Sequence, residues 1–266
     1  MKLTHNQGVR LLQIATHIIA LPLVIWAVVQ GWWGWLMVSW LTYWFIGILG
    51  INVGFHRMAA HGAFKTYKPI EAFLLFCGVL TTVGSPLAWT IVHRIHHIHT
   101  DQEHDPHSPQ NIGVFRAWFG VWNTSGFTQA GRVSKGLRKD PLHRWMHANY
   151  FEILILWCLL LYITLGWQGV VFVYAVPAIL SLHSACGIIV IPHLHGYRNH
   201  DLKGDTSRNS WIANLVTMGE GWHNNHHAHP SRWTTQERWW EWDIPAQIIK
   251  LIHRRDTPLP KYRRTL

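Results

Sequence analysis

The sequence is poor in cysteine, with three Cys among 266 residues. Three cysteines are too few for a disulfide framework or for the four-cysteine spacing of an iron–sulfur protein. Charged side chains are also scarce, at 14% of the chain, and a soluble domain usually has about a quarter. Because 49% of the residues are apolar, disorder is excluded as well. The composition leaves a membrane protein or a protein with a very large core.

Lysine and arginine are missing from two long stretches, residues 11–56 and 145–197. A helix that spans a bilayer needs about 20 mostly apolar residues. Four runs approach or meet this standard, and the turns between the members of each pair are very short. We therefore expect four transmembrane helices in two hairpins, at residues 11–29, 32–55, 151–165 and 170–191.

A fifth apolar stretch, residues 70–92, contains Glu71 and is interrupted by Gly78, Gly84 and Pro86. We expect it to be interfacial or half-inserted, because a fifth crossing would separate the histidine-rich segments. With four crossings, residues 1–10, 56–150 and 192–266 share one side of the membrane. All 23 basic side chains lie on that side, which the positive-inside rule identifies as the cytoplasm.

The fold prediction is an all-α integral membrane protein with a single domain over residues 1–266. A cytoplasmic helical cap, residues 56–150 and 192–266, follows from the topology. The net charge of +10 then reports membrane orientation. Nucleic-acid binding is disfavoured because the chain has no basic helix, zinc-finger spacing or RNA-binding signature.

Histidine is abundant, with 21 residues, and eight of them form three clusters. On a helix, positions i, i+3 and i+4 share one face, whereas i and i+5 diverge by about 140°. We therefore expect His61 just beyond the end of the second span. Six isolated histidines are expected to be ordinary surface or core residues: His5, His17, His143, His147, His200 and His253. The three clusters are His56 and His61; His93, His96 and His97; and His223, His226 and His227.

Eight clustered histidines predict a site for two metal ions, because they exceed what one ion can take. Imidazole suits zinc, copper, iron and nickel. A hydrolytic zinc site would need a carboxylate base beside the ions, whereas iron with dioxygen suits attack on a hydrocarbon chain. The Glu-x-x-His pairs of soluble di-iron bundles are absent from the clusters.

The spacings H-x4-H, H-x2-H-H and H-x2-H-H resemble the integral-membrane fatty-acid desaturases, specifically the Δ9 or stearoyl-type branch. The similarity covers about residues 30–250. It extends to Asn52-Val-Gly-Phe-His-Arg57, Asp105-Pro-His-Ser-Pro109, Gly196-Tyr-Arg198 and Gly219-Glu-Gly-Trp-His-Asn-Asn-His-His-Ala228.

The resemblance implies a di-iron centre ligated by the eight box histidines, with His193 as a further ligand. Zinc could replace iron in the purified protein, since imidazole accepts several metals. An Asn that the family usually has is Ile189 here, and we consider His183 or His195 as its replacement. Glu220, Asn224 and Asn225 are expected to orient the ligating imidazoles.

The implied reaction is oxygen-dependent introduction of a cis double bond, with Δ9 favoured, into a long saturated acyl chain. Electrons must come from an external donor, a ferredoxin or a cytochrome b5-type protein, because the chain has no haem-attachment motif or Rossmann fingerprint. Walls of the acyl tunnel are expected at residues 88–90 and 216–218. Stearoyl-CoA enzymes of the family have a basic pair where Gln110 and Asn111 stand, which favours an acyl-lipid or other carrier over acyl-CoA.

Two other functions remain open at this point. A membrane hydroxylase or ketolase uses similar boxes and leaves oxygen in its product. A non-catalytic metal transporter or sensor would place polar residues along a path through the spans, and here only His17 and His183 lie deep in them. Double-bond position, chain length, donor and oligomeric state are not determined by the sequence.

Overall fold

The computed structural model describes residues 4–120, 130–217 and 219–259, and over these residues every regular element is a helix. The all-α prediction is therefore confirmed. The elements, with η marking π or 3-10 helices, are α1 (His5–Val29), α2 (Trp33–Ile46), η1 (Gly47–Ala60), α3 (Lys68–Leu80), α4 (Pro86–His99), α5 (Pro109–Ile112), α6 (Val114–Gly120), α7 (Ala130–Val133), η2 (Leu137–Lys139), α8 (Pro141–Ala148), α9 (Tyr150–Gly169), η3 (Val170–Ala175), α10 (Val176–Leu194), α11 (Trp211–Thr217), α12 (His223–Ala228) and α13 (Ile244–Ile252).

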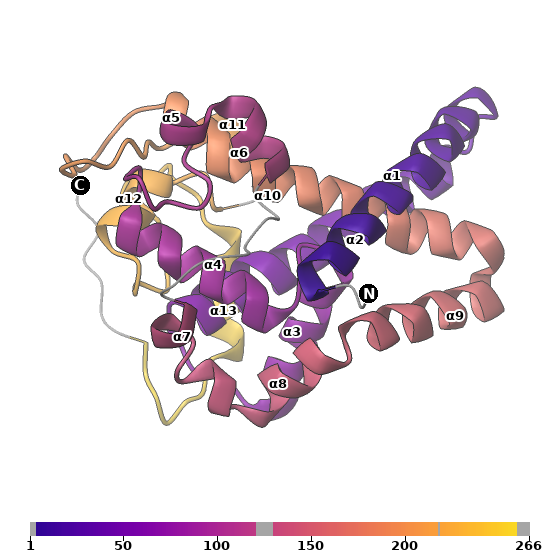
Figure 1. The fold of residues 1–266 in the computed structure, drawn as a ribbon, viewed down its shortest axis with the longest axis horizontal. Helices are drawn as coiled ribbons and strands as arrows, with labels where there is room; N and C mark the ends of the chain where they lie inside the picture. The colour runs from indigo at the N-terminus through magenta and orange to yellow at the C-terminus, as the bar shows by residue number, and fades with distance from the viewer. Residues whose placement is uncertain (1–3, 121–129, 218, 260–266) are drawn as a thin grey trace.

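Among the described residues, three helical runs are long and apolar enough to cross a membrane: His5–Val29, Trp33–Ala60 and Tyr150–Leu194. The last run contains both predicted spans 151–165 and 170–191, and it is broken at Gly166, where φ is 69°. Glycine adopts this left-handed conformation without a steric penalty. In Figure 1 the chain turns back between α9 and α10, and the long helices extend away from the shorter ones that surround α4 and α12.

Tryptophan rings at the ends of the long helices contact one another. Trp32 stacks on Trp167 with ring centroids 5.8 Å apart, and Trp26 lies 6.0 Å from Trp167. The turn after α1 and the break at Gly166 therefore lie next to each other. Such amphipathic rings are favoured at the level of the lipid headgroups.

The stretch 70–92 forms parts of two helices, α3 and α4, and neither is among the runs long enough to span a membrane. Ser85 begins α4 by accepting a hydrogen bond from the Ala88 amide, as an N-cap residue does. Helix α3 crosses η1 closely at Gly50, where an added Cβ would come within 2.3 Å of the Gly78 nitrogen. This packing places η1 beside the histidine-bearing helix α4.

Candidate metal centre

Five histidines from three segments form the first histidine group: His56, His61, His93, His97 and His226. One ligand nitrogen from each lies within 4.8 Å of those of the others. Nε2 of His61 is 2.8 Å from Nε2 of His93, and Nε2 of His56 is 3.0 Å from Nε2 of His226. His56 and His226 are buried and the other three are half-buried.

Four histidines form the second histidine group: His96, His193, His223 and His227. Their side chains are buried, and one ligand nitrogen from each again lies within 4.8 Å of the others. Nε2 of His193 is 3.2 Å from Nε2 of His223. All nine predicted ligand histidines are thus found in two adjacent groups, including His193 near the end of α10.

Each of the two His-x-x-His-His boxes is divided between the groups. In α4, His93 and His97 belong to the first group and His96 to the second; in α12, His226 belongs to the first group and His223 and His227 to the second. Neighbouring histidines on one helix therefore serve different groups. The tertiary packing of α4 against α12 and η1 sets this division.

His61 lies just beyond the end of the second apolar helix, as expected. The helix extends past the predicted boundary at residue 55 to Ala60, and this last part is a π-helix with His61 as its C-cap. The His61 amide donates to the His56 carbonyl at 3.1 Å. In this i→i+5 arrangement, residues five apart lie about one turn apart on the same side. His56 and His61 therefore converge, although a regular α-helix would separate them.

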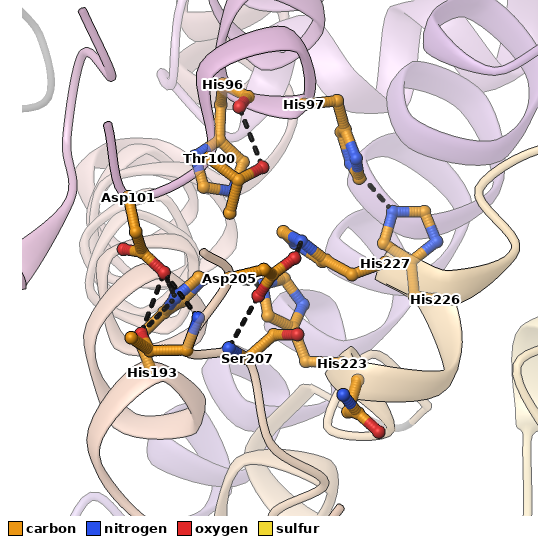
Figure 2. Close-up of polar contacts among 12 residues, drawn as sticks. His96, His97, Thr100, Asp101, His193, Asp205, Ser207, His223, His226 and His227 are labelled. Atoms are coloured by element: carbon orange, nitrogen blue, oxygen red, sulfur yellow. Dashed lines mark hydrogen bonds and ion pairs between the residues drawn. The ribbon is translucent and has the colours of Figure 1, made fainter. Parts of the chain in front are cut away.

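Four carboxylates whose side chains are at most 12% exposed contact the ring nitrogens that face away from the two groups. Nδ1 of His56 is 2.8 Å from Glu220, and Nδ1 of His96 is 2.9 Å from Asp105. Figure 2 shows the equivalent contacts of Asp101 with His193, at 3.1 Å, and of Asp205 with His227, at 2.7 Å. A carboxylate that accepts a hydrogen bond from Nδ1–H fixes the proton on Nδ1. The Nε2 lone pair is then directed towards the group, as in carboxylate–histidine–metal sites.

The donor set fits metal ions. Nε2 of His227 is buried without a hydrogen-bond partner among the described residues, although buried polar atoms are normally paired. Burial, together with the nearby His56, lowers the pKa of His61 to about 2. Burial also lowers the pKa of His227, to about 4, against the opposing effect of Asp205. Converging neutral imidazoles are the form that metal ions require.

Glu220 connects the first group to a buried arginine. Burial alone would raise the pKa of Glu220, but Arg57 and His56 outweigh it and lower that pKa to about 2. Arg57 donates to Glu220 at 3.0 Å and to Asp243 at 2.8 Å, and its side chain is 1% exposed. This network fixes the position of Glu220 and hence the ring of His56.

Asn224 and Asn225 do not have the predicted role of orienting the histidine rings. The Asn224 side chain bonds to the backbone of residues 199 and 200, and the Asn225 side chain bonds to Asn199, Asn209 and Glu241. Within the described residues, neither side chain is hydrogen-bonded to an imidazole. The orienting residues that were missed are Asp101, Asp105 and Asp205. Asp105 precedes a Pro-His pair in a motif noted in the sequence, but only the fold shows which histidine it contacts.

The suggested replacements for the missing family Asn are also wrong. His183 pairs with His17, with their Nε2 atoms 3.1 Å apart, and accepts a hydrogen bond from Trp118. His195 is exposed. Neither belongs to a histidine group. Ile189 instead lines an apolar cavity that also reaches His96 and His223.

This cavity begins at the histidines and runs between the long helices. Histidines of both groups line it, together with Glu220 and mainly apolar residues of α2, α4 and α10. The expected tunnel residues Ala88, Trp89, Val216 and Thr217 are in its wall, whereas Thr90 is not. Met218 lies outside the described residues. An apolar chain could thus reach the metal centre without passing through water.

Comparison with known proteins assigns the family. The fatty acid desaturase family model matches residues 30–264. An sn-1 stearoyl-lipid 9-desaturase of Anabaena variabilis is 35% identical over 83% of this chain and 81% of its own length. A Delta-9 acyl-lipid desaturase of Arabidopsis thaliana is 36% identical over 80% and 71%, respectively. An acyl-CoA C20 Delta5-desaturase of Anemone leveillei is 33% identical over 80% and 72%.

These matches, over most of the chain, agree with a centre built from histidine-rich groups that could hold metal ions. Members of the family are oxidoreductases that act on fatty acyl chains. The chain belongs to the fatty acid desaturase family.

Proposed function

We propose that this protein is an oxygen-dependent Δ9 acyl-lipid desaturase whose two histidine groups each hold one iron ion. The observation that carries the proposal is the convergence of nine imidazoles into two groups beside an apolar cavity. The eight box histidines and His193 would be the ligands. The relatives in Anabaena variabilis and Arabidopsis thaliana are named as Δ9 desaturases of acyl-lipids, which supports the same chemistry for this chain.

When bound, two iron ions with dioxygen supply the oxidant that removes one hydrogen from each of two adjacent methylenes. The products are a cis double bond and two water molecules, and two electrons and two protons enter from outside for each turnover. The protein holds the acyl chain in the cavity and excludes water from it. Its carboxylates orient the ligating imidazoles, and burial favours their neutral form. Positioning of a chain without polar handles is the main contribution of such a site.

The loop after Pro109 favours an acyl-lipid over acyl-CoA. Gln110 donates to the His193 carbonyl at 3.2 Å, and Asn111 donates to the Gln102 carbonyl at 2.5 Å. Two exposed amide side chains that donate to backbone carbonyls thus stand where the acyl-CoA branch has a basic pair. Arginine pairs are well suited to bind phosphates, and this loop does not offer one.

We also propose that the chain is one domain that crosses the membrane four times, with α9 and α10 as separate crossings on either side of Gly166. The termini and the metal centre then lie in the cytoplasm, in agreement with the distribution of Lys and Arg. Labelling of single cysteines placed near residues 30 and 140 in intact cells tests this topology. Opposite accessibility at the two positions supports it, and equal accessibility contradicts it.

Expression in a host with a simple fatty-acid profile tests the reaction. A new cis double bond between carbons 9 and 10 of lipid-bound chains, absent when His226→Ala replaces the wild type, supports the proposal. A hydroxylated or oxo product would instead identify a hydroxylase or ketolase. Unchanged lipids, with metal bound, would indicate a non-catalytic metal-binding protein. Purified enzyme that desaturates acyl-CoA efficiently and acyl-lipid poorly would overturn the choice of carrier.

A further inference from the structure

A group of five aromatic rings connects the protein surface to the second histidine group. We call Tyr197, Trp211, Trp222, Trp240 and Trp242 the aromatic cluster. Trp211 and Trp240 are stacked with centroids 5.5 Å apart, and Trp211 lies 4.9 Å from Trp222. Tyr197 lies 5.5 Å from Trp240, and Trp242 lies 6.4 Å from Trp211. Each ring is therefore close to at least one other ring.

The inner end of the cluster adjoins the metal centre. Trp222 is fully buried and immediately precedes His223, and its Nε1 donates to the Trp242 carbonyl at 2.8 Å. His223 in turn faces His193 across the second histidine group. The outer end is accessible, because Trp211 is 42% exposed and the neighbouring Trp239 is 82% exposed.

The outer end is also positively charged. The Arg238 guanidinium lies 5.3 Å from the Tyr197 ring and 5.5 Å from the Trp240 ring. Arg238 is exposed, and within the described part of the chain its guanidinium forms no ion pair with a carboxylate. Such a surface charge next to exposed aromatic rings is typical of an interface that attracts a partner of opposite charge.

We propose that the surface formed by Trp211, Arg238 and Trp240 is the docking site of an acidic one-electron carrier protein, and that the aromatic cluster conducts its electrons to the metal centre. The inference rests on the proposed function, which requires two external electrons per double bond. Electron tunnelling weakens steeply with the gap between groups, so closely spaced π systems favour this route. Breaking two C–H bonds releases two protons and four electrons, of which two electrons form the π bond of the product. The other two electrons, the two one-electron donations and four protons in total, two of them from outside, reduce dioxygen to two water molecules.

An anionic lipid surface would also attract arginine and tryptophan. Continuity of the rings inward to Trp222 favours the electron carrier, because a lipid contact would use only the exposed end. The two partners predict different outcomes for the same variants.

The test uses the full-length, metal-loaded enzyme in nanodiscs, an acidic plant-type ferredoxin as donor and dithionite as a small reductant. Arg238→Glu should weaken ferredoxin binding, measured without turnover, and raise the ferredoxin KM at least fivefold, while Arg238→Lys retains wild-type values. Increasing salt should raise the wild-type KM, because exposed charges are screened. Lys135→Glu, a matched charge reversal at an exposed residue between α7 and α8, should change neither value.

Trp240→Leu tests conduction. Under anaerobic conditions, it should slow the oxidation of saturating ferredoxin at least fivefold while reduction by dithionite and the metal content stay unchanged; Trp240→Phe should retain most of the rate.

Unchanged ferredoxin binding and KM in Arg238→Glu would overturn the proposal. If that variant instead loses affinity for anionic vesicles, the surface binds lipid. Failure of the proposed function is distinguishable, because the wild type would then form no double bond with either reductant.

Discussion

The backbone amide of His61 donates to the carbonyl of His56, five residues earlier, at 3.1 Å. This bond closes the last turn of η1 and brings the two imidazole rings to 4.9 Å between centroids. Arg94 donates to the carbonyls of Ala59 and Ala60 and supports the end of the helix. The π-helical turn is therefore what allows the first box to contribute both of its histidines to one group.

His226 occupies the middle of the first histidine group, with Nε2 3.0 Å from Nε2 of both His56 and His97. We expect His226→Ala to lose most of one equivalent of metal and all double-bond formation, because the remaining ligands no longer enclose the ion. Metal analysis of the purified protein and lipid analysis of expressing cells measure both effects. His253→Ala is the matched control, since within the described residues the His253 ring bonds only to nearby backbone carbonyls. Full metal content in His226→Ala would contradict the assignment.

Glu220 accepts hydrogen bonds from both His56 and Arg57 through its two carboxylate oxygens. In Glu220→Gln one of these positions becomes an amide donor, so the His56 ring loses its orientation or Arg57 loses a buried partner. We expect metal affinity to fall about 10- to 100-fold, as is typical when an outer partner of a ligand is removed. Competition with a chelator measures the affinity. Glu103→Gln, at an exposed position, is the control, and equal affinities in both variants would refute the role of Glu220.

Acid should destabilise the metal-free protein between about pH 6.5 and 4. Burial lowers the pKa of His227 from 6.5 to about 4, so the folded protein resists a proton that the unfolded chain accepts. The contribution of His227 to the free energy of unfolding is fully present above pH 6.5 and is lost as the pH falls towards 4. Thermal unfolding of metal-free protein in detergent over this pH range checks the sign. A midpoint that stays constant or rises on acidification would be inconsistent with neutral buried histidines.

Gly50 lies where η1 and α3 approach most closely, and an added Cβ would come within 2.3 Å of the Gly78 nitrogen. Because that atom belongs to the backbone, it cannot move aside without displacing α3. We expect Gly50→Ala to destabilise the fold by about 1–3 kcal/mol. Gly34→Ala is the control, since no atom lies within 4 Å of the added Cβ. Retention of monomeric protein after heating in detergent compares the two, and equal retention would contradict close packing at Gly50.

Much of the candidate site follows from local sequence. The spacing within α4 and α12 predicts that their histidines share a helix face, and the resemblance adds His193, which does join the second histidine group. The long apolar runs predict helices that can cross a membrane, and three such runs are present, one of them broken at Gly166. These features depend on helical periodicity and hydropathy, which act over a few residues.

Other features were decided by contacts between distant segments. The contact of Asp205 with His227, the division of each box between two groups and the aromatic packing around Trp222 each join residues that spacing alone does not relate. The π-helical turn that brings His56 and His61 together was likewise not predicted from the sequence. The sequence alone determined the kinds of ligand and the membrane-length helices, because both depend on the spacing and hydropathy of residues that are close together in the chain. The tertiary structure decided which histidines face each other and which carboxylates orient them, because those choices depend on how η1, α4, α10 and α12 pack together.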